Sequence, residues 1–267
     1  SAGYQTNYAN PQTGVRRLIP DYTKYSIGGF VTGNYTFNTQ WLLEAGVRID
    51  HTFMDVYKFY RRSFWEERGY DTQFSDLVIQ QVGNQVLTNP KLRFTNPAFT
   101  LGVKHTFGTY MLFANYSIAS RAPNASELFS EGLHHSASRI ELGDLQFGSE
   151  TAHKVSLTLQ QRAEKFDFTI MPYSNTIDNY ILIEPTGIRQ TIRGNFQVWE
   201  YRQTRAQIFG IDVDASLSLF DNVSFTHQFS LIKGYDISQK QALISMPSAS
   251  TKNSLIYTNL KHHNLKV

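Results

Sequence analysis

The feature that most constrains the fold of this sequence is a two-residue alternation of apolar and polar side chains. The clearest run is 209–219, where apolar residues occupy the odd positions and small or acidic residues the even ones. Side chains of a β-strand point alternately to opposite faces, so such a run has one apolar face and one polar face. The pattern predicts nine strands, at residues 24–37, 40–59, 93–107, 109–119, 151–163, 165–183, 196–219, 223–234 and 251–260. We therefore expect an all-β, antiparallel fold.

The connections between the predicted strands alternate in length. Tight turns are expected at 38–39, 108–109, 164–165 and 221–222, and long connections near 60–92, 120–150, 184–195 and 235–250. Short turns at one end and long loops at the other are typical of a transmembrane β-barrel of the outer membrane. A soluble β-sandwich also alternates its faces, but its strands usually have five or six residues, fewer than several predicted here.

Composition narrows the function classes. Aromatic residues make up 14% of the chain. Those near predicted strand ends fit the aromatic girdles of a membrane barrel; they are Trp41, Phe107, Tyr110, Tyr180, Trp199 and Phe220. The chain has no Cys, and its net charge of +3 is scattered, which argues against thiolate chemistry and nucleic-acid binding. No apolar run is long enough for a transmembrane helix. No catalytic motif is present, so we expect neither an enzyme nor a cofactor.

The strand count indicates a partial barrel. Nine is odd, whereas bacterial single-chain barrels have even numbers of strands. The chain also ends in Leu265-Lys266-Val267, without a terminal aromatic residue. We expect residues 1–267 to form a single segment of a larger barrel, truncated at both ends.

The most distinctive segment follows the fourth predicted strand. It contains Arg121, Pro123, Asn124, Glu127, Leu128, Phe129, Gly132, Gly143 and Glu150. Pro123 is expected to end the strand. Asn124 can begin a short helix, with Glu127 reaching back to it as in a capping box. The apolar pair 128–129 can anchor this helix, and Gly132 can end it. We therefore predict a structured loop.

This segment resembles TonB-dependent outer-membrane receptors, which carry an Arg-x-Pro-x-x-x-Glu-Leu-Phe run followed by Gly, His, a second Gly and a Glu that opens the next strand. His134 or His135 matches the family's His. Weaker matches follow in order at 175–181, 201–212 and 244–257, although Asp212 stands where the family usually has Glu. The resemblance implies a 22-stranded barrel whose lumen holds an N-terminal plug domain. No plug is recognised in residues 1–267.

The resemblance also implies a function. Such receptors lie in the lipid of the outer membrane of Gram-negative bacteria. They bind a ferric siderophore, haem or another metal complex and import it with energy from the TonB complex, which acts through the plug. A small outer-membrane barrel of another class, such as a porin, a secretion barrel or a barrel enzyme, is the alternative.

Two groups of loop residues are candidates for ligand contact. The first group is Arg61, Arg62, Trp65 and Arg139. Arginine beside aromatic rings can hold an anionic ferric complex by charge and stacking, although charge runs are often only solvated loops. The second group is the adjacent pair His134 and His135, which could bind Zn or Cu. Alternatively, one of them holds the loop by a hydrogen bond.

Overall fold

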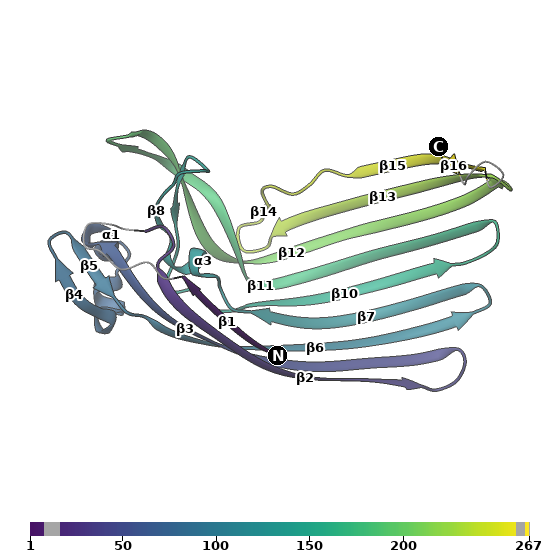
Figure 1. Ribbon diagram of the computed structural model, residues 1–267, viewed down its shortest axis with the longest axis horizontal. Helices are drawn as coiled ribbons and strands as arrows, with labels where there is room; N and C mark the ends of the chain where they lie inside the picture. Colours follow the sequence, from purple (N-terminus) through teal and green to yellow (C-terminus); the bar gives the residue numbers. More distant parts are fainter. Residues whose placement is uncertain (8–16, 260–264, 267) are drawn as a thin grey trace.

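In the computed structural model, which describes residues 1–7, 17–259 and 265–266, long antiparallel strands form one curved sheet (Figure 1). In sheet order they are β1 (Ala2–Asn7), β2 (Asp21–Thr36), β3 (Trp41–Arg61), β6 (Lys91–Phe107), β7 (Tyr110–Arg121), β10 (Glu150–Gln161), β11 (Phe166–Thr191), β12 (Gly194–Phe220), β13 (Val223–Asp236), β15 (Ser250–Asn259) and β16 (Leu265–Lys266). All nine predicted strands are confirmed. The sheet is not closed, because β1 and β16 are its two ends, and this fits a partial barrel.

Tight turns join the strands at one end of the sheet, the turn end, and shorter elements gather at the opposite loop end (Figure 1). These are α1 (Arg62–Glu67), α2 (Tyr70–Gln73), the 3-10 turn η1 (Ser75–Leu77), β4 (Val78–Val82), β5 (Gln85–Thr88), α3 (Ala125–Phe129), β8 (Glu131–His134), β9 (Arg139–Leu142) and β14 (Gln241–Ala242). No helix in the described part of the chain is long and apolar enough to cross a membrane.

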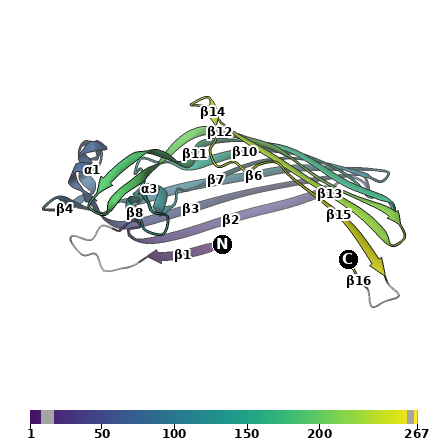
Figure 2. The same ribbon diagram turned by 90° about the horizontal axis from the view of Figure 1, so that it is seen from above.

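The alternation places unlike residues on the two faces of the sheet. Val31 and Val47 face each other across β2 and β3 and are 70% and 55% exposed. The intervening positions carry polar groups such as Arg48, which donates to the Asp50 carboxylate at 2.5 and 2.6 Å. Figure 2 shows that the sheet is curved, with α3 and β8 on its concave side. The exposed apolar face is what a lipid-facing surface requires.

Aromatic rings line the turn end. The Trp41 and His105 rings stack with centroids 4.0 Å apart, and the Phe107 and Tyr110 rings stack at 5.5 Å. Phe220, which ends β12 just before the tight turn at 221–222, is exposed. These residues lie where one aromatic girdle is expected.

The prediction of a long connection at 184–195 is wrong. β11 and β12 instead continue as a projecting hairpin that closes with a tight turn between Thr191 and Gly194. Proline and glycine are common in loops, but the structure accommodates Pro185 and Gly187 at a β-bulge. A proline is tolerated there because β11 pairs with β10 only as far as Asp178, so its second edge carries no ladder beyond that point.

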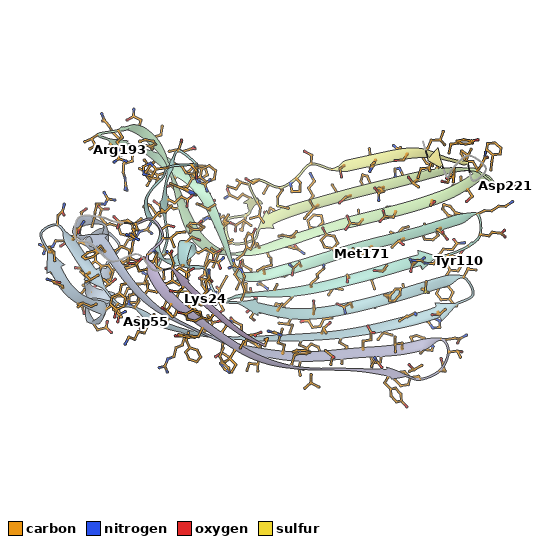
Figure 3. All side chains as sticks on the ribbon, in the orientation of Figure 1. Lys24, Asp55, Tyr110, Met171, Arg193 and Asp221 are labelled. Carbon is orange, nitrogen blue, oxygen red and sulfur yellow. The ribbon has the colours of Figure 1, made fainter. Side chains whose placement is uncertain are left out.

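The buried apolar side chains gather at the loop end. They include Met54, Val56, Tyr60, Phe64, Trp65, Tyr70, Leu128, Phe129, Ile140, Leu142 and Val198. Tyr180 and Trp199 also lie at this end: Tyr180 packs in a second cluster with Leu182 and Leu243, and Trp199 lies in the projecting hairpin. A hydrophobic core therefore organises the loops, and the side chains of Figure 3 are densest there.

Candidate functional site

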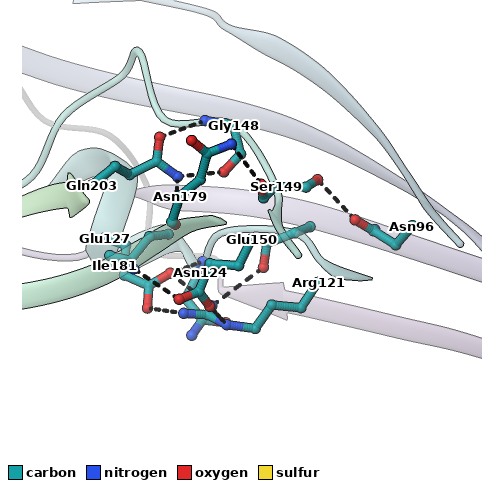
Figure 4. A network of polar contacts seen from close by, with 11 residues as sticks. Asn96, Arg121, Asn124, Glu127, Gly148, Ser149, Glu150, Asn179, Ile181 and Gln203 are labelled. Carbon is teal, nitrogen blue, oxygen red and sulfur yellow. Dashed lines mark hydrogen bonds and ion pairs between the residues drawn. The ribbon is translucent and has the colours of Figure 1, made fainter. Parts of the chain in front are cut away.

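Arg121, the last residue of β7, is the centre of a polar network at the base of the loop end (Figure 4). Its guanidinium donates to both carboxylate oxygens of Glu127, at 3.0 and 3.1 Å, and forms an ion pair with Glu150. Glu150 lies directly opposite Arg121 in the β7–β10 register. Its second oxygen accepts the Ile181 N–H at 2.8 Å. The motif residues therefore tie β7, α3, β10 and β11 together.

The predicted capping box is present. Asn124 is the N-cap residue of α3, and its N–H donates to Glu127 Oε2 at 2.7 Å. Leu128 and Phe129 are 1% and 0% exposed and anchor α3 in the loop core. Gly132 does not end the helix as predicted: α3 ends at Phe129, and Gly132 lies inside strand β8.

Gly143 allows the return segment of the motif loop, residues 122–149, to lie against α3. Its N–H donates to Ser130 O at 2.7 Å, and Asp144 N–H donates to Glu127 O at 3.0 Å. A Cβ at Gly143 would lie 2.6 Å from that same Glu127 oxygen, which is closer than a Cβ atom comes to a backbone atom of another segment in a folded protein. The glycine is therefore required by a close approach of two backbone segments.

Tyr70 joins the loop between β3 and β6 to the motif loop. Its hydroxyl donates to Asp144 Oδ1 at 2.7 Å and accepts the Leu145 N–H at 3.0 Å. Burial raises the pKa of Tyr70, and the Asp144 carboxylate raises it further. This residue was not predicted as part of the site, because nothing in the local sequence distinguishes it from the other aromatic residues of its loop.

The four candidates for ligand contact are all engaged in contacts within the chain. Arg61 donates through Nε to Glu131 Oε1 at 2.7 Å, and the Glu131 side chain is 1% exposed. Arg62 donates to Gln81 Oε1 at 2.5 Å. Trp65 is 2% exposed and packs against Tyr60 and Tyr70 in the loop core. Its prediction as a contact is corrected, because burial leaves it no surface for a ligand.

Arg139 and His134 lie around one carboxylate rather than around a metal site. Glu141 Oε1 accepts from Arg139 Nη2 at 2.7 Å and is 2.8 Å from His134 Nδ1. Arg139 also lies over the Trp199 ring at 4.7 Å. His135 is exposed in the following turn. Within the described ranges no three His, Cys, Asp or Glu side chains are placed to hold a metal, so the metal prediction is not supported.

A polar cleft of about 410 Å³ lies between the loops at the base of the projecting hairpin. It is lined by Arg68, Asp144, Gln146, Phe147, Glu184, Thr186, Glu200, Tyr201, Arg202 and Gln203. Its arginines are paired: Arg68 Nη2 is 3.3 Å from Glu200, and Arg202 contacts both Glu184 and Asp236. Hydrogen-bonding groups and two aromatic rings thus line a space large enough for a small molecule.

Long amphipathic strands, an exposed apolar face and a packed layer of loops at one end define a segment of a large membrane β-barrel. A family model described as "TonB dependent receptor-like, beta-barrel" matches residues 1–258. The chain therefore belongs to the TonB-dependent receptors, which are outer-membrane proteins of Gram-negative bacteria.

Solved structures support the fold. The chain is similar to the copper transporter OprC, with a TM-score of 0.69 and 19% identity over 90% of this chain and 34% of that one. It is similar to the haemophore receptor HasR of Serratia marcescens (TM-score 0.67, 12% identity, 97% and 45% coverage). It is also similar to the ferric yersiniabactin uptake receptor FyuA of Yersinia pestis (0.61, 10%, 90% and 32%). The chain spans less than half of each protein. A search of curated sequences found no match.

Proposed function

We propose that this chain is part of an outer-membrane receptor that binds a scarce nutrient at its loop end and imports it with energy from the TonB complex. The polar cleft of about 410 Å³ carries the proposal, because it lies among loops held in place by a hydrophobic core and the Arg121 network. A passive pore would need neither such a core nor such a network. TonB would act through a plug domain, and lipid would cover the exposed apolar face.

A metal complex is the favoured nutrient. The titles of the similar structures name a copper transporter, a haemophore receptor with haem and a ferric yersiniabactin receptor. The cleft supports a compact polar ligand, since its wall combines carboxylates, guanidinium groups and amides with the rings of Phe147 and Tyr201. A ferric siderophore, haem or a copper complex is therefore the class to test first.

The test is uptake of labelled iron-siderophore, haem and copper by cells of the source bacterium, with and without the full-length receptor. Uptake of one class is expected to require both the receptor and TonB. Glu200→Gln, which alters the cleft, is expected to weaken uptake at equal receptor abundance. The matched control is Gln161→Glu at the turn end, which makes the opposite change far from the loops. Receptor-dependent uptake that persists without TonB would instead favour a passive porin.

A further inference from the structure

The tip of the projecting hairpin, residues 187–196, exposes apolar side chains that the barrel does not explain. Ile188 is 78% exposed and Ile192 is fully exposed, at 103%. Most other exposed apolar residues lie on the long strands, and those outside them, such as Ile79 at 54% and Ile244 at 42%, are less exposed than the two hairpin isoleucines. The hairpin extends beyond those strands (Figure 1) and bends toward the concave side of the sheet (Figure 2). Membrane lipid therefore does not account for these isoleucines, and exposed apolar surface of this kind marks interaction sites.

The charges of the hairpin tip are also uncompensated. Arg189 and Arg193 are the charged residues in 185–199, a stretch without Asp or Glu. Among the residues that the structure describes, neither guanidinium has an ion-pair partner. Most arginines at the loop end do have one, namely Arg61, Arg68, Arg121, Arg139, Arg202 and Arg205. The tip thus presents two free positive charges beside two exposed isoleucines.

One edge of the hairpin is open. β9 pairs in parallel with β12 at 197–200 and covers one side of the hairpin base. On the other side, β11 pairs with β10 only up to Asp178, and no described strand pairs with that edge from Asn179 to Thr191. An unpaired strand edge is a template on which an extended segment can add as a further strand.

We propose that the hairpin tip is a docking surface for an extended acidic segment of a partner protein that reaches the receptor from outside the cell. The segment adds to the free edge of β11, its carboxylates pair with Arg189 and Arg193, and its apolar side chains cover Ile188 and Ile192. A second copy of this chain is a poorer occupant, because two tips of equal positive charge repel each other. The proposal goes beyond nutrient import and holds whichever nutrient is carried.

The test measures binding of a fluorescent peptide to the full-length receptor in detergent micelles by anisotropy. The probe alternates Glu and Val over seven residues. One control peptide replaces each Glu by Lys, and a second places Pro at the central position, where it blocks a strand ladder. The acidic probe is expected to bind at least about tenfold more tightly than either control, with an affinity that falls as salt is raised.

Variants locate the binding. Arg189→Gln with Arg193→Gln is expected to weaken probe binding by about threefold to tenfold, the range for two exposed charge pairs. The double variant Ile188→Ser with Ile192→Ser is expected to weaken probe binding by more than the arginine double variant does. Arg162→Gln, at the turn end, is the matched control and should change nothing. All these side chains lie on the surface, and thermal melting of each variant checks that it folds.

Three results would overturn the proposal. The first is that the acidic and basic peptides bind equally tightly, or that the double substitution of Arg189 and Arg193 leaves the affinity for the acidic peptide unchanged. The second is that the receptor binds phosphatidylglycerol vesicles and that substituting the two arginines abolishes this binding but not peptide binding. That result would assign the tip to a lipid surface. The third is that sedimentation shows a concentration-dependent dimer, which disappears when Ile188 and Ile192 are replaced by Ser. That result would assign the tip to contact with a second copy of the chain.

Discussion

Replacing Arg121 by Met is expected to loosen the motif loop while the sheet stays folded. Methionine keeps an unbranched apolar stem but removes the guanidinium that Glu127 and Glu150 share. The side chains of these two glutamates are only 11% and 9% exposed. Both carboxylates would then be left nearly buried without a cation.

The magnitude follows from this burial. Removing one partner of a buried ion pair costs about 3–5 kcal/mol, because the remaining charge is left uncompensated. The Arg121 side chain is 43% exposed, so water already screens part of the interaction. We therefore expect a loss of about 2 kcal/mol in the local stability of the loop, which is about a 30-fold change in its opening equilibrium.

Hydrogen–deuterium exchange of the full-length receptor in micelles measures this opening. The amides of Leu128, Ser130 and Gly143, which are hydrogen-bonded within the motif loop, should exchange about 30-fold faster. Arg62→Met is the matched control, because Arg62 contacts an exposed glutamine, and it should leave these amides within about twofold of the wild type.

A second replacement sharpens the test of Arg121. Adding Glu127→Gln to Arg121→Met removes one of the two uncompensated charges, so part of the lost protection should return. Exchange in Arg121→Met that stays within about threefold of the wild type would refute the reasoning, since the network would then contribute less than about 0.7 kcal/mol. Equal acceleration in the long strands would also refute it, because the effect would be global.

Four further predictions concern the same loops. Tyr70→Phe removes the hydrogen bond to Asp144 and is expected to cost about 1–2 kcal/mol of loop stability, seen as faster limited proteolysis of residues 122–149. Burial raises the pKa of Tyr70 above its ordinary value of 10.0, so its stabilisation is present below pH 10 and lost as pH rises further; absorbance titration should show a phenol that ionises late. Gly143→Ala should push residue 143 away from α3, because the added Cβ would lie 2.6 Å from Glu127 O, and exchange of the α3 amides would report it. Trp65→Ala should cost about 3–5 kcal/mol by opening a cavity, measured as a lowered midpoint of loop unfolding.

The strands could be predicted because each is long, alternates regularly and ends at a tight turn. β1 was missed because its sequence, Ala-Gly-Tyr-Gln-Thr-Asn, is short and has no alternation. The projecting hairpin was missed because Pro185 and Gly187 are local signals for a loop. Whether a proline ends a strand depends on whether its edge is paired, and pairing with β10 stops at Asp178. That information lies in the register, which a single strand's sequence does not contain.

The site divides in the same way. The capping box of Asn124 and Glu127 could be predicted, because its partners lie only three positions apart in the sequence. The pairing of Arg121 with Glu150 is set by the β7–β10 register across the intervening loop, so both residues could be named from the sequence but their contact could not be predicted. Trp65 was misassigned because the neighbouring arginines suggested a ligand contact, whereas the aromatic side chains around it form a core.

The state of each arginine decides which loop-end residues are available to a ligand. A guanidinium already held by a carboxylate, as Arg61 is by Glu131, offers little attraction to an anion, because binding would have to displace a satisfied charge. Nothing in the sequence distinguishes Arg61 and Arg139 from Arg189, and only their contacts in the structure show which of them are paired. Arg61 and Arg139 therefore shape the loops, while the unpaired Arg189 keeps its full charge for a molecule outside the chain. An acidic partner protein should accordingly be sought at the hairpin tip, whereas the cleft lined in part by Arg68 is the place to test for the nutrient.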